Sequence, residues 1–427
     1  MAVRAPEIAS GRWYNSVPLR LEDLHGGVVI LDFFTYGCIN CLNNIRTMQE
    51  LQRLYGDAIT LIGIHSAKFA REKECEALQA AIQRLGITYA VVDDASHRLW
   101  QQYAVRAWPT TVLIDRRGYL CETFRGERTV MDFKEALEAK GIVPGTKETL
   151  RHAEGEGLRF PEKLCCTEEF LAVANTGSGS VWLCGYDGAV QKRYEGFSEP
   201  MGMAFEAPNL YVAERGSGTV VVLDVESGER QTLLEGLRAP YELALAEGIL
   251  YVAEAGCHQI TAHALDDGRT VAVWGNRFEA LRDGAFEEAQ LAQPSALSIL
   301  HERLWFVDAE SSALRYIEGE AVHTAVGEGL HSFGDSDEGE ILLQHPQGVV
   351  AGQYGDGCGG GRIFIADTYN DKVKVYNPDD GSMMTLLDTL HGPGGIAKKG
   401  CTLYIADTNA HAIIAFDLPT MAQSLFL

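Results

Sequence analysis

The 427-residue sequence lacks the long apolar segments of membrane proteins and the leader of exported ones. It contains no run of about 18 or more uncharged apolar residues, which a membrane-spanning helix requires. The first residues, MAVRAPEIASGRWYNSV, include no apolar stretch typical of a secretory signal. The sequence therefore predicts a cytoplasmic protein that does not enter a membrane.

Positive charge is scarce in the second half of the chain. Residues 1–145 carry 17 Lys and Arg against 17 Asp and Glu, whereas residues 146–427 carry 19 against 42, so the whole net charge of −23 lies there. The negative electrostatic potential of so acidic a segment repels nucleic-acid phosphates and anionic lipid headgroups. We therefore expect no nucleic-acid or membrane partner, and we expect the second half to favour a basic protein partner.

Metal-binding and hydrolytic signatures are also few. No second CxxC or CxxH pair accompanies the one CxxC motif, which argues against a zinc site. No Ser-His-Asp, HExxH or P-loop pattern occurs in the acidic half. We expect no metal and no cofactor.

The ten cysteines are dispersed through the chain, so we expect most of them to be reduced, small, buried residues. Cys358 lies in a glycine-rich stretch and is expected to be an exposed loop thiol. We assign no function to Cys358, Cys75 or Cys121. Five others fall on expected strands and are interpreted as core residues: Cys165, Cys166, Cys184, Cys257 and Cys401.

Strand and helix alternate in residues 1–145. Val28–Phe34 is a continuous apolar run, which predicts a strand covered on both faces. Apolar residues then recur every three or four positions from Leu42 to Leu54, which predicts a helix. Further strands are expected at residues 58–64, 88–92, 110–114 and 119–124, and further helices at residues 72–85, 96–103 and 132–139. This order predicts an α/β sheet with mixed strand directions.

The CxxC motif, Cys38-Ile39-Asn40-Cys41, stands where the first strand feeds the first helix. Cys38 is expected at the helix N-terminus, where unpaired N–H groups and the helix dipole stabilise a thiolate and lower the pKa of the thiol. Cys41, one turn on, is placed to attack a mixed disulfide on Cys38. The pattern predicts dithiol–disulfide exchange in which Cys38 attacks and Cys41 resolves.

Asp32 lies within the apolar strand, six residues before Cys38. A buried carboxylate with a raised pKa could take the proton of the second thiol as a general base. The alternative is that Asp32 is only a hydrogen-bonded acid of the core. His65 ends a strand near the expected site and is interpreted as a structural loop residue.

The first half resembles the thioredoxin family. The spacing from Asp32 to the CxxC motif matches the buried aspartate and redox pair of that family, and the run from Ala107 to Thr110 matches its cis-proline loop. The resemblance implies that Pro109 is cis and presents backbone to a substrate. It also implies a substrate groove lined by Trp108, Thr110, Ile39 and Asn40.

The chain departs from the thioredoxin pattern at the motif itself. Gly37 replaces the aromatic residue before the first cysteine, and Ile39-Asn40 replaces Gly-Pro between the cysteines. Because the redox potential depends on these neighbours, the direction of exchange stays open. A half zinc site and a redox-inactive module stay open as alternatives.

Internal repeats fill the chain from residue 160 onward. Six strand-like segments end in an acid or Asn, with spacings of 39, 40, 54, 59 and 40 between these last residues. Each unit adds three more short strands, which is the composition of a propeller blade. A period near 40 with insertions at residues 276–293 and 328–345 predicts a six-bladed propeller. The six anchor residues are Asn175, Glu214, Glu254, Asp308, Asp367 and Asp407.

Two repeats, IFIADTYNDKVKVYN and LYIADTNAHAIIAFD, resemble NHL repeats, through Asp367 with Asn370 and Asp407 with His411. The six anchor residues could form an acidic ring. We interpret each of them as a cap that binds backbone N–H groups of its own strand-to-strand turn, rather than as part of a metal ring.

The run TYGCINC, GIHSAKF, RAWPT and six repeats, in that order, resembles the bacterial relatives of NHL repeat-containing protein 2 over almost the whole chain. That family has Cys-Cys-Ile-Asn-Cys, so Gly37 replaces its first cysteine. We expect an α/β thioredoxin-like domain at residues 1–145, a linker at 146–156 and an all-β, six-bladed NHL-type propeller at 157–427.

Three functions follow as hypotheses. The leading one is a cytosolic thiol-disulfide oxidoreductase that acts on a protein thiol or disulfide and uses its propeller for partner recognition. The second is a redox-inactive interaction scaffold. The third is a metal-dependent propeller hydrolase with an acidic central site.

Overall fold

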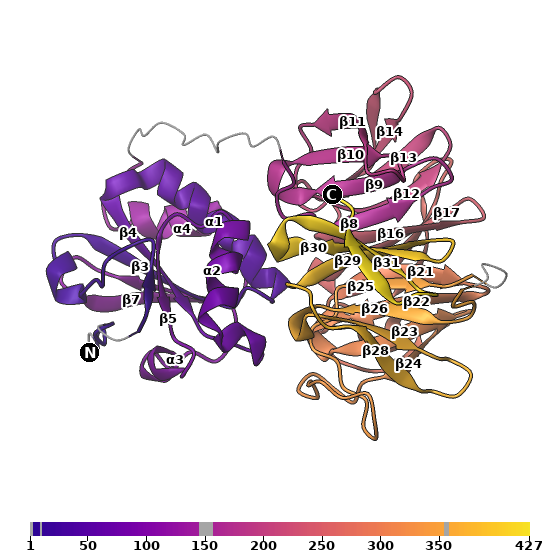
Figure 1. Cartoon of the computed structure of the whole chain (residues 1–427). Coiled ribbons are helices and arrows are strands. Elements are labelled where there is room, and N and C mark those ends of the chain that lie inside the picture. Colours follow the sequence, from indigo (N-terminus) through magenta and orange to yellow (C-terminus); the bar gives the residue numbers. More distant parts are fainter. Residues whose placement is uncertain (1–2, 9–10, 145–156, 354–357) are drawn as a thin grey trace. The chain divides into compact units, whose positions relative to one another are not determined.

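The computed structural model describes residues 3–8, 11–144, 157–353 and 358–427. The chain divides into two compact units, Met1–Ala153 and Glu154–Leu427 (Figure 1). The expected linker at residues 146–156 lies outside the described residues. The predicted fold class is confirmed: an α/β unit with a mixed sheet precedes six four-stranded blades in the described part of the chain.

The first unit is built on one mixed sheet with strand order β1-β7-β6-β3-β4-β5-β2. β3 is parallel to β4 and antiparallel to β6, so the predicted mixture of directions is confirmed. The strands are β1 Val3–Arg4, β2 Trp13–Tyr14, β3 Val28–Phe34, β4 Ile59–His65, β5 Ala90–Asp93, β6 Thr110–Ile114 and β7 Tyr119–Arg125. The helices are α1 Ile39–Tyr55, α2 Cys75–Arg84, α3 Arg98–Gln102 and α4 Val130–Glu138.

Burial explains why the central strand and its helix form. Every residue of β3 is buried, which is the environment that a continuous apolar run requires. α1 buries Leu42, Ile45, Met48 and Leu51, which recur at helical spacing. The helix therefore packs one face on the sheet. Its first turn lies near the C-terminal end of β3, because only four residues separate the two elements. No described helix combines the length and the apolar character that crossing a bilayer would require.

The second unit consists of six blades, each formed by four antiparallel strands in sequence order. The innermost strands are β8 Lys163–Cys166, β12 Pro200–Glu206, β16 Pro240–Ala246, β21 Pro294–Leu300, β25 Gly348–Ala351 and β29 Pro393–Lys399. The second strands are β9 Leu171–Asn175, β13 Asn209–Glu214, β17 Ile249–Glu254, β22 Arg303–Asp308, β26 Ile363–Asp367 and β30 Thr402–Asp407. The third are β10 Ser180–Cys184, β14 Thr219–Asp224, β18 Gln259–Ala264, β23 Ala313–Glu318, β27 Lys372–Tyr376 and β31 Ala412–Asp417. The outermost are β11 Val190–Glu195, β15 Arg230–Leu234, β19 Thr270–Trp274, β24 Ala321–Val326, β28 Met383–Leu387 and β32 Ala422–Leu425.

The two insertions are held to the blades that follow them by buried cations. In the fourth blade, Arg315 bonds to Asp283 of the first insertion at 3.0 Å. In the fifth blade, Lys374 bonds to Asp335 and Asp337 of the second insertion at 2.9 and 3.0 Å. The first insertion also adds a short strand, β20 Gly284–Ala285, to the edge of the fourth blade. Both insertions are therefore integral to the propeller.

A lysine closes the centre of the propeller. Lys163 lies on the innermost strand of the first blade and is 1% exposed. Its Nζ donates to the carbonyl oxygens of Ser295 and Gln347, each at 2.6 Å, and lies 3.0 Å from the Glu242 carboxylate. These partners belong to the fourth, fifth and third blades, so the side chain crosses the central axis. The ammonium group thus links the innermost strand of the first blade to three other blades.

The ring closes between the last blade and the first without exchanging strands. Figure 1 shows the first blade in magenta beside the last in yellow, and β29 lies against β8. The Thr408 hydroxyl donates to the Pro161 carbonyl at 2.8 Å, and the Phe160 N–H donates to His411 Nδ1 at 3.0 Å. The Phe160 and His411 rings also meet edge to face. Hydrogen bonds and ring contacts thus contribute to this closure.

We expect acid to weaken the ring closure through His411. Burial, followed by the Arg159 charge, lowers the pKa of His411, so the neutral ring accepts from Phe160. The unfolded state binds the proton more readily. The contribution of neutral His411 to the free energy of unfolding should therefore be fully present above pH 6.5 and decrease as the pH falls below that value. His411→Asn keeps an acceptor and tolerates the left-handed backbone of this residue, but it does not titrate.

Hydrogen–deuterium exchange of the full chain at pH 7.5 and 5.5 tests this prediction. The protection factor of the Phe160 amide should fall at pH 5.5 by about fivefold in the wild type, the equivalent of one hydrogen bond of about 1 kcal/mol. It should stay constant in His411→Asn. An equal fall in both proteins would show that His411 is not the titrating group.

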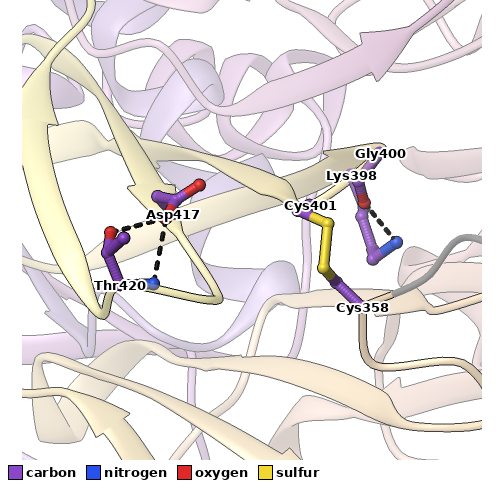
Figure 2. Close-up of a disulfide and its surroundings, with 6 residues drawn as sticks. All are labelled: Cys358, Lys398, Gly400, Cys401, Asp417 and Thr420. Carbon is purple, nitrogen blue, oxygen red and sulfur yellow. Dashed lines mark hydrogen bonds between the residues drawn. A yellow bond between two sulfur atoms is a disulfide. The ribbon is translucent and has the colours of Figure 1, made fainter.

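The structure corrects the expectation for Cys358 and Cys401. The two form a disulfide, shown in Figure 2, instead of a free loop thiol and a core thiol. Cys358 precedes β26 and Cys401 lies in the turn before β30, so they occupy corresponding connections of the fifth and sixth blades. Their separation of 43 residues is close to the repeat period, which brings the two connections together. Cys257 is also not on a strand, since it ends a 3₁₀ turn.

Candidate functional site

Cys38 and Cys41 stand at the start of α1, as the sequence predicts. Cys38 is the N-cap residue of the helix, and its carbonyl accepts from the Cys41 and Leu42 N–H groups at 3.0 Å. Cys38 is 8% exposed and Cys41 is fully buried, and both are free thiols. Burial, together with a thiol hydrogen bond to Cys38, raises the pKa of Cys41 well above its usual value. The buried thiol therefore needs a proton acceptor before it can react.

Asp32 supplies a carboxyl group on the same side of the sheet. It is fully buried, and its Oδ1 accepts from Asn44 Nδ2 at 2.8 Å and from the Thr111 hydroxyl at 3.1 Å. Burial raises the pKa of Asp32 to about 7, although both hydrogen bonds act to lower it. Because Asn44 follows Cys41 by one helical turn, the helix that carries the thiol also holds the acid. A carboxyl with a pKa near 7 can accept and release a proton at physiological pH.

The expected cis-proline loop is present. The Trp108–Pro109 peptide bond is cis, as the sequence resemblance implied. The Trp108 Nε1–H donates to the Ser66 carbonyl at 2.9 Å, and the ring lies 4.3 Å from that of Trp100. Trp108 and Asn40 are partly exposed, whereas Ile39 and Thr110 are each 1% exposed. A substrate groove formed by these four residues stays a prediction, with Trp108 and Asn40 offering the accessible surface.

Asn44 and Glu72 were not singled out by the sequence reasoning. A polar Asn44 among the apolar positions of the helix is a signal that could have identified the first. The Glu72 carboxylate, 1% exposed, accepts from the backbone N–H groups of Gly37 at 3.1 Å, Lys68 at 2.5 Å and Phe69 at 3.1 Å. It therefore ties the turn before Cys38 to the loop after β4, and no local pattern marks it.

His65 ends β4 and is fully buried. Its ring stacks on Tyr36 at 5.3 Å, and Nδ1 lies 4.0 Å from an Asp93 carboxylate oxygen. Both ring nitrogens lack a hydrogen-bond partner among the described residues. His65 is therefore a buried residue of the strand that packs against Tyr36, and not the loop residue that the sequence predicted.

The six anchor residues of the propeller act in the same way in every blade. Each accepts a backbone N–H from the segment that enters the innermost strand of its own blade, at 2.6 to 2.9 Å. The donors are Arg159, Ser198, Arg238, Ala292, Gln344 and His391. In the part of the chain that the structure describes, no three His, Cys, Asp or Glu side chains are grouped to hold a metal. The anchors therefore fix blade geometry.

Known proteins resemble both units. A family model described as thioredoxin-like matches residues 26–120. NHL repeat-containing protein 2 of Bos taurus is 31% identical, over 99% of this chain and 71% of that protein. The Homo sapiens protein of that name is 30% identical, over 98% and 71%. Thiol-disulfide oxidoreductase ResA of Geobacillus thermodenitrificans is 32% identical, over 28% of this chain and 67% of that protein.

Proposed function

Because the chain belongs to the family of NHL repeat-containing protein 2, with a thioredoxin-like unit before its propeller, we propose that it catalyses thiol–disulfide exchange at Cys38 and Cys41. The observation that carries the proposal is the pairing of a fully buried thiol, Cys41, with a fully buried acid, Asp32, whose pKa lies at about 7. The resemblance of the first unit to a protein named as a thiol-disulfide oxidoreductase supports it.

The proposed reaction balances within the dithiol and one substrate disulfide. The Cys38 thiolate attacks one substrate sulfur, a mixed disulfide forms, and the other substrate sulfur leaves as a thiolate that takes up a proton. Asp32 then accepts the proton of Cys41, and the Cys41 thiolate attacks Cys38 Sγ. The substrate leaves with both sulfurs reduced, and the Cys38–Cys41 disulfide carries the oxidation. The reverse sequence transfers a disulfide to substrate thiols.

The propeller is proposed to recognise the protein partner. Lys163 is bound by carbonyl groups of two other blades at the centre, and the anchor residues accept backbone N–H groups, so we place recognition on the outer surfaces of the blades. The net charge of −23 over residues 146–427 favours a basic partner whose association weakens with salt.

We expect Cys41→Ser to trap the substrate on Cys38. The substrate is a disulfide-linked peptide dimer, which forms a mixed disulfide with Cys38. Without the Cys41 thiol, no residue of the motif can attack this mixed disulfide, so the adduct should accumulate in the full chain. Mass spectrometry should locate one peptide on Cys38, whereas the wild type should show the Cys38–Cys41 disulfide. Limiting alkylation of the reduced wild type should label Cys38 before Cys41, because only Cys38 reaches the surface.

Cys121→Ser is the matched control, because Cys121 is an exposed free thiol on β7 of the same unit. It should exchange like the wild type. An adduct that forms only at Cys121, or the absence of any adduct on Cys38, would favour the interaction scaffold instead.

A further inference from the structure

Besides the Thr111 hydroxyl, a second buried hydroxyl, that of Tyr89, lies near Asp32. Tyr89 precedes β5, is 3% exposed, and its hydroxyl has no hydrogen-bond partner among the residues that the structure describes. The Oδ2 atom of Asp32 is also buried without such a partner, while Oδ1 receives two hydrogen bonds. Buried polar groups are nearly always satisfied, so two unsatisfied oxygens in one region point to a use.

The sheet register places these two groups on one face. Asp32 of β3 and Gly63 of β4 are partners in the parallel register, so a side chain at residue 63 would point to the same face as Asp32. A Cβ at Gly63 would lie 3.1 Å from Cε2 of Tyr89. Cε1 of Phe34 would lie 3.0 Å from the same Cβ, so the Tyr89 and Phe34 rings together fill the space that the missing side chain leaves next to the acid.

The backbone of Tyr89 is held in place by two neighbouring segments. The Asn15 side-chain amide donates to the Tyr89 carbonyl at 3.1 Å and to the Ile87 carbonyl at 2.8 Å. Gly63 pairs with Val91 in the next strand, which fixes the register of the segment that carries Tyr89. The backbone of Tyr89 is therefore fixed between the Asn15 side chain and the first residue of β5.

Burial keeps this hydroxyl protonated. Burial raises the pKa of Tyr89 well above its ordinary value, and the charges of Asp32 and Cys41 raise it further. Those two groups are the titratable neighbours that act on Tyr89, from β3 and α1, while Asn44 and Thr111 contribute neutral donors to Asp32. At physiological pH Tyr89 is consequently a donor for a carboxylate.

We propose that Tyr89 is a positioning residue for the proton transfer: its hydroxyl donates, through one water molecule, to Oδ2 of Asp32 when the acid is ionised. This role rests on the proposed exchange reaction, because an ionised Asp32 matters only where Cys41 must lose a proton. The third donor stabilises the carboxylate and so enlarges the fraction of protein that is ready to accept that proton.

Tyr89→Phe tests the proposal, with Tyr55→Phe as the matched control. Tyr55 is also buried, at 1% exposure, and its hydroxyl likewise lacks a partner in the described chain, but it lies at the far end of α1 from Cys41. The titration of Asp32 is followed by carbon NMR of the side-chain carboxyl in the reduced full-length protein. The midpoint should rise by about one pH unit in Tyr89→Phe, which is a tenfold fall in the ratio of ionised to protonated Asp32, and stay in place in Tyr55→Phe.

Gly63→Ala gives a second route to the same result. The added methyl group would crowd both the Phe34 and the Tyr89 rings without removing the hydroxyl, so the Asp32 midpoint should rise here as well. An unchanged midpoint in Tyr89→Phe, or an equal rise in Tyr55→Phe, would overturn the proposal. The titration needs no substrate, so it still decides whether Tyr89 stabilises ionised Asp32 if the wild type fails to exchange disulfides. That failure would remove the proposed function and the role in proton transfer, but not the interaction of Tyr89 with Asp32.

Discussion

Asp32→Asn is expected to slow the resolution of a mixed disulfide by about 10²- to 10⁴-fold, the usual effect of losing a general base. Cys41 is fully buried and its pKa is raised, so its proton has to pass to a nearby group before the sulfur can attack. Asparagine occupies the same space and can keep hydrogen bonds to Asn44 and Thr111, but it cannot accept a proton.

The pH profile makes this prediction specific. Single-turnover resolution in the wild type should accelerate as the pH rises through about 7, where Asp32 ionises, and this step should be missing in Asp32→Asn. The two proteins should differ little at pH 5, because Asp32 is then protonated in the wild type. Equal rates at pH 8 would leave Asp32 as a structural acid of the core.

Stability should change in the opposite direction to activity. The folded-state pKa of Asp32 lies above its unfolded value of about 4, so its contribution to stability is complete below pH 4 and is lost as the pH rises through about 7. A difference of about three units corresponds to about 4 kcal/mol. The first unit of the wild type should therefore lose stability between pH 4 and 7 in urea unfolding, and Asp32→Asn should lack this loss.

The sequence was sufficient for the elements that depend on local patterns. The continuous apolar run predicted β3 at its observed bounds, and the strand at residues 110–114 was equally well placed. The cis-proline loop followed from resemblance. The boundaries of the helices were less accurate: the expected helix at residues 72–85 is observed as α2 at Cys75–Arg84, because Arg71–Lys73 form a separate 3₁₀ turn and the extended Glu74 separates the two.

Contacts between distant segments were outside the reach of such patterns. The Cys358–Cys401 disulfide depends on two connections that meet only when neighbouring blades stack. Gly63 lies on β4 and Tyr89 lies just before β5, and only the sheet register brings them to Asp32. The anchor residues were recognised as backbone caps, but their donors lie 16 or 23 residues earlier in the chain rather than in the turn that follows.

Arg315→Met is expected to destabilise the propeller by about 3–5 kcal/mol, the usual cost of leaving one partner of a buried ion pair. The Arg315 guanidinium is fully buried, and its Nη1 donates to the equally buried Asp308 at 2.9 Å. Its Nη2 donates to Asp283 of the insertion at 3.0 Å, and the two nitrogens also bind the Gln290 and Arg282 carbonyls. Methionine fills much of the volume but leaves the Asp308 charge and both carbonyls without these donors.

Arg303→Met in the same blade separates this effect from the loss of any arginine. Arg303 pairs with Glu318 at 2.9 Å, but both side chains are more than a third exposed, and such surface pairs contribute about 0–1 kcal/mol. In thermal unfolding of the full chain, Arg315→Met should lower the propeller midpoint by roughly 10 °C, while Arg303→Met should lower it by a few degrees at most. The midpoint of the first unit serves as the internal reference. Equal shifts in both variants would mean that the insertion is held to the fourth blade by packing alone, because the buried guanidinium would then contribute no more than a solvated one.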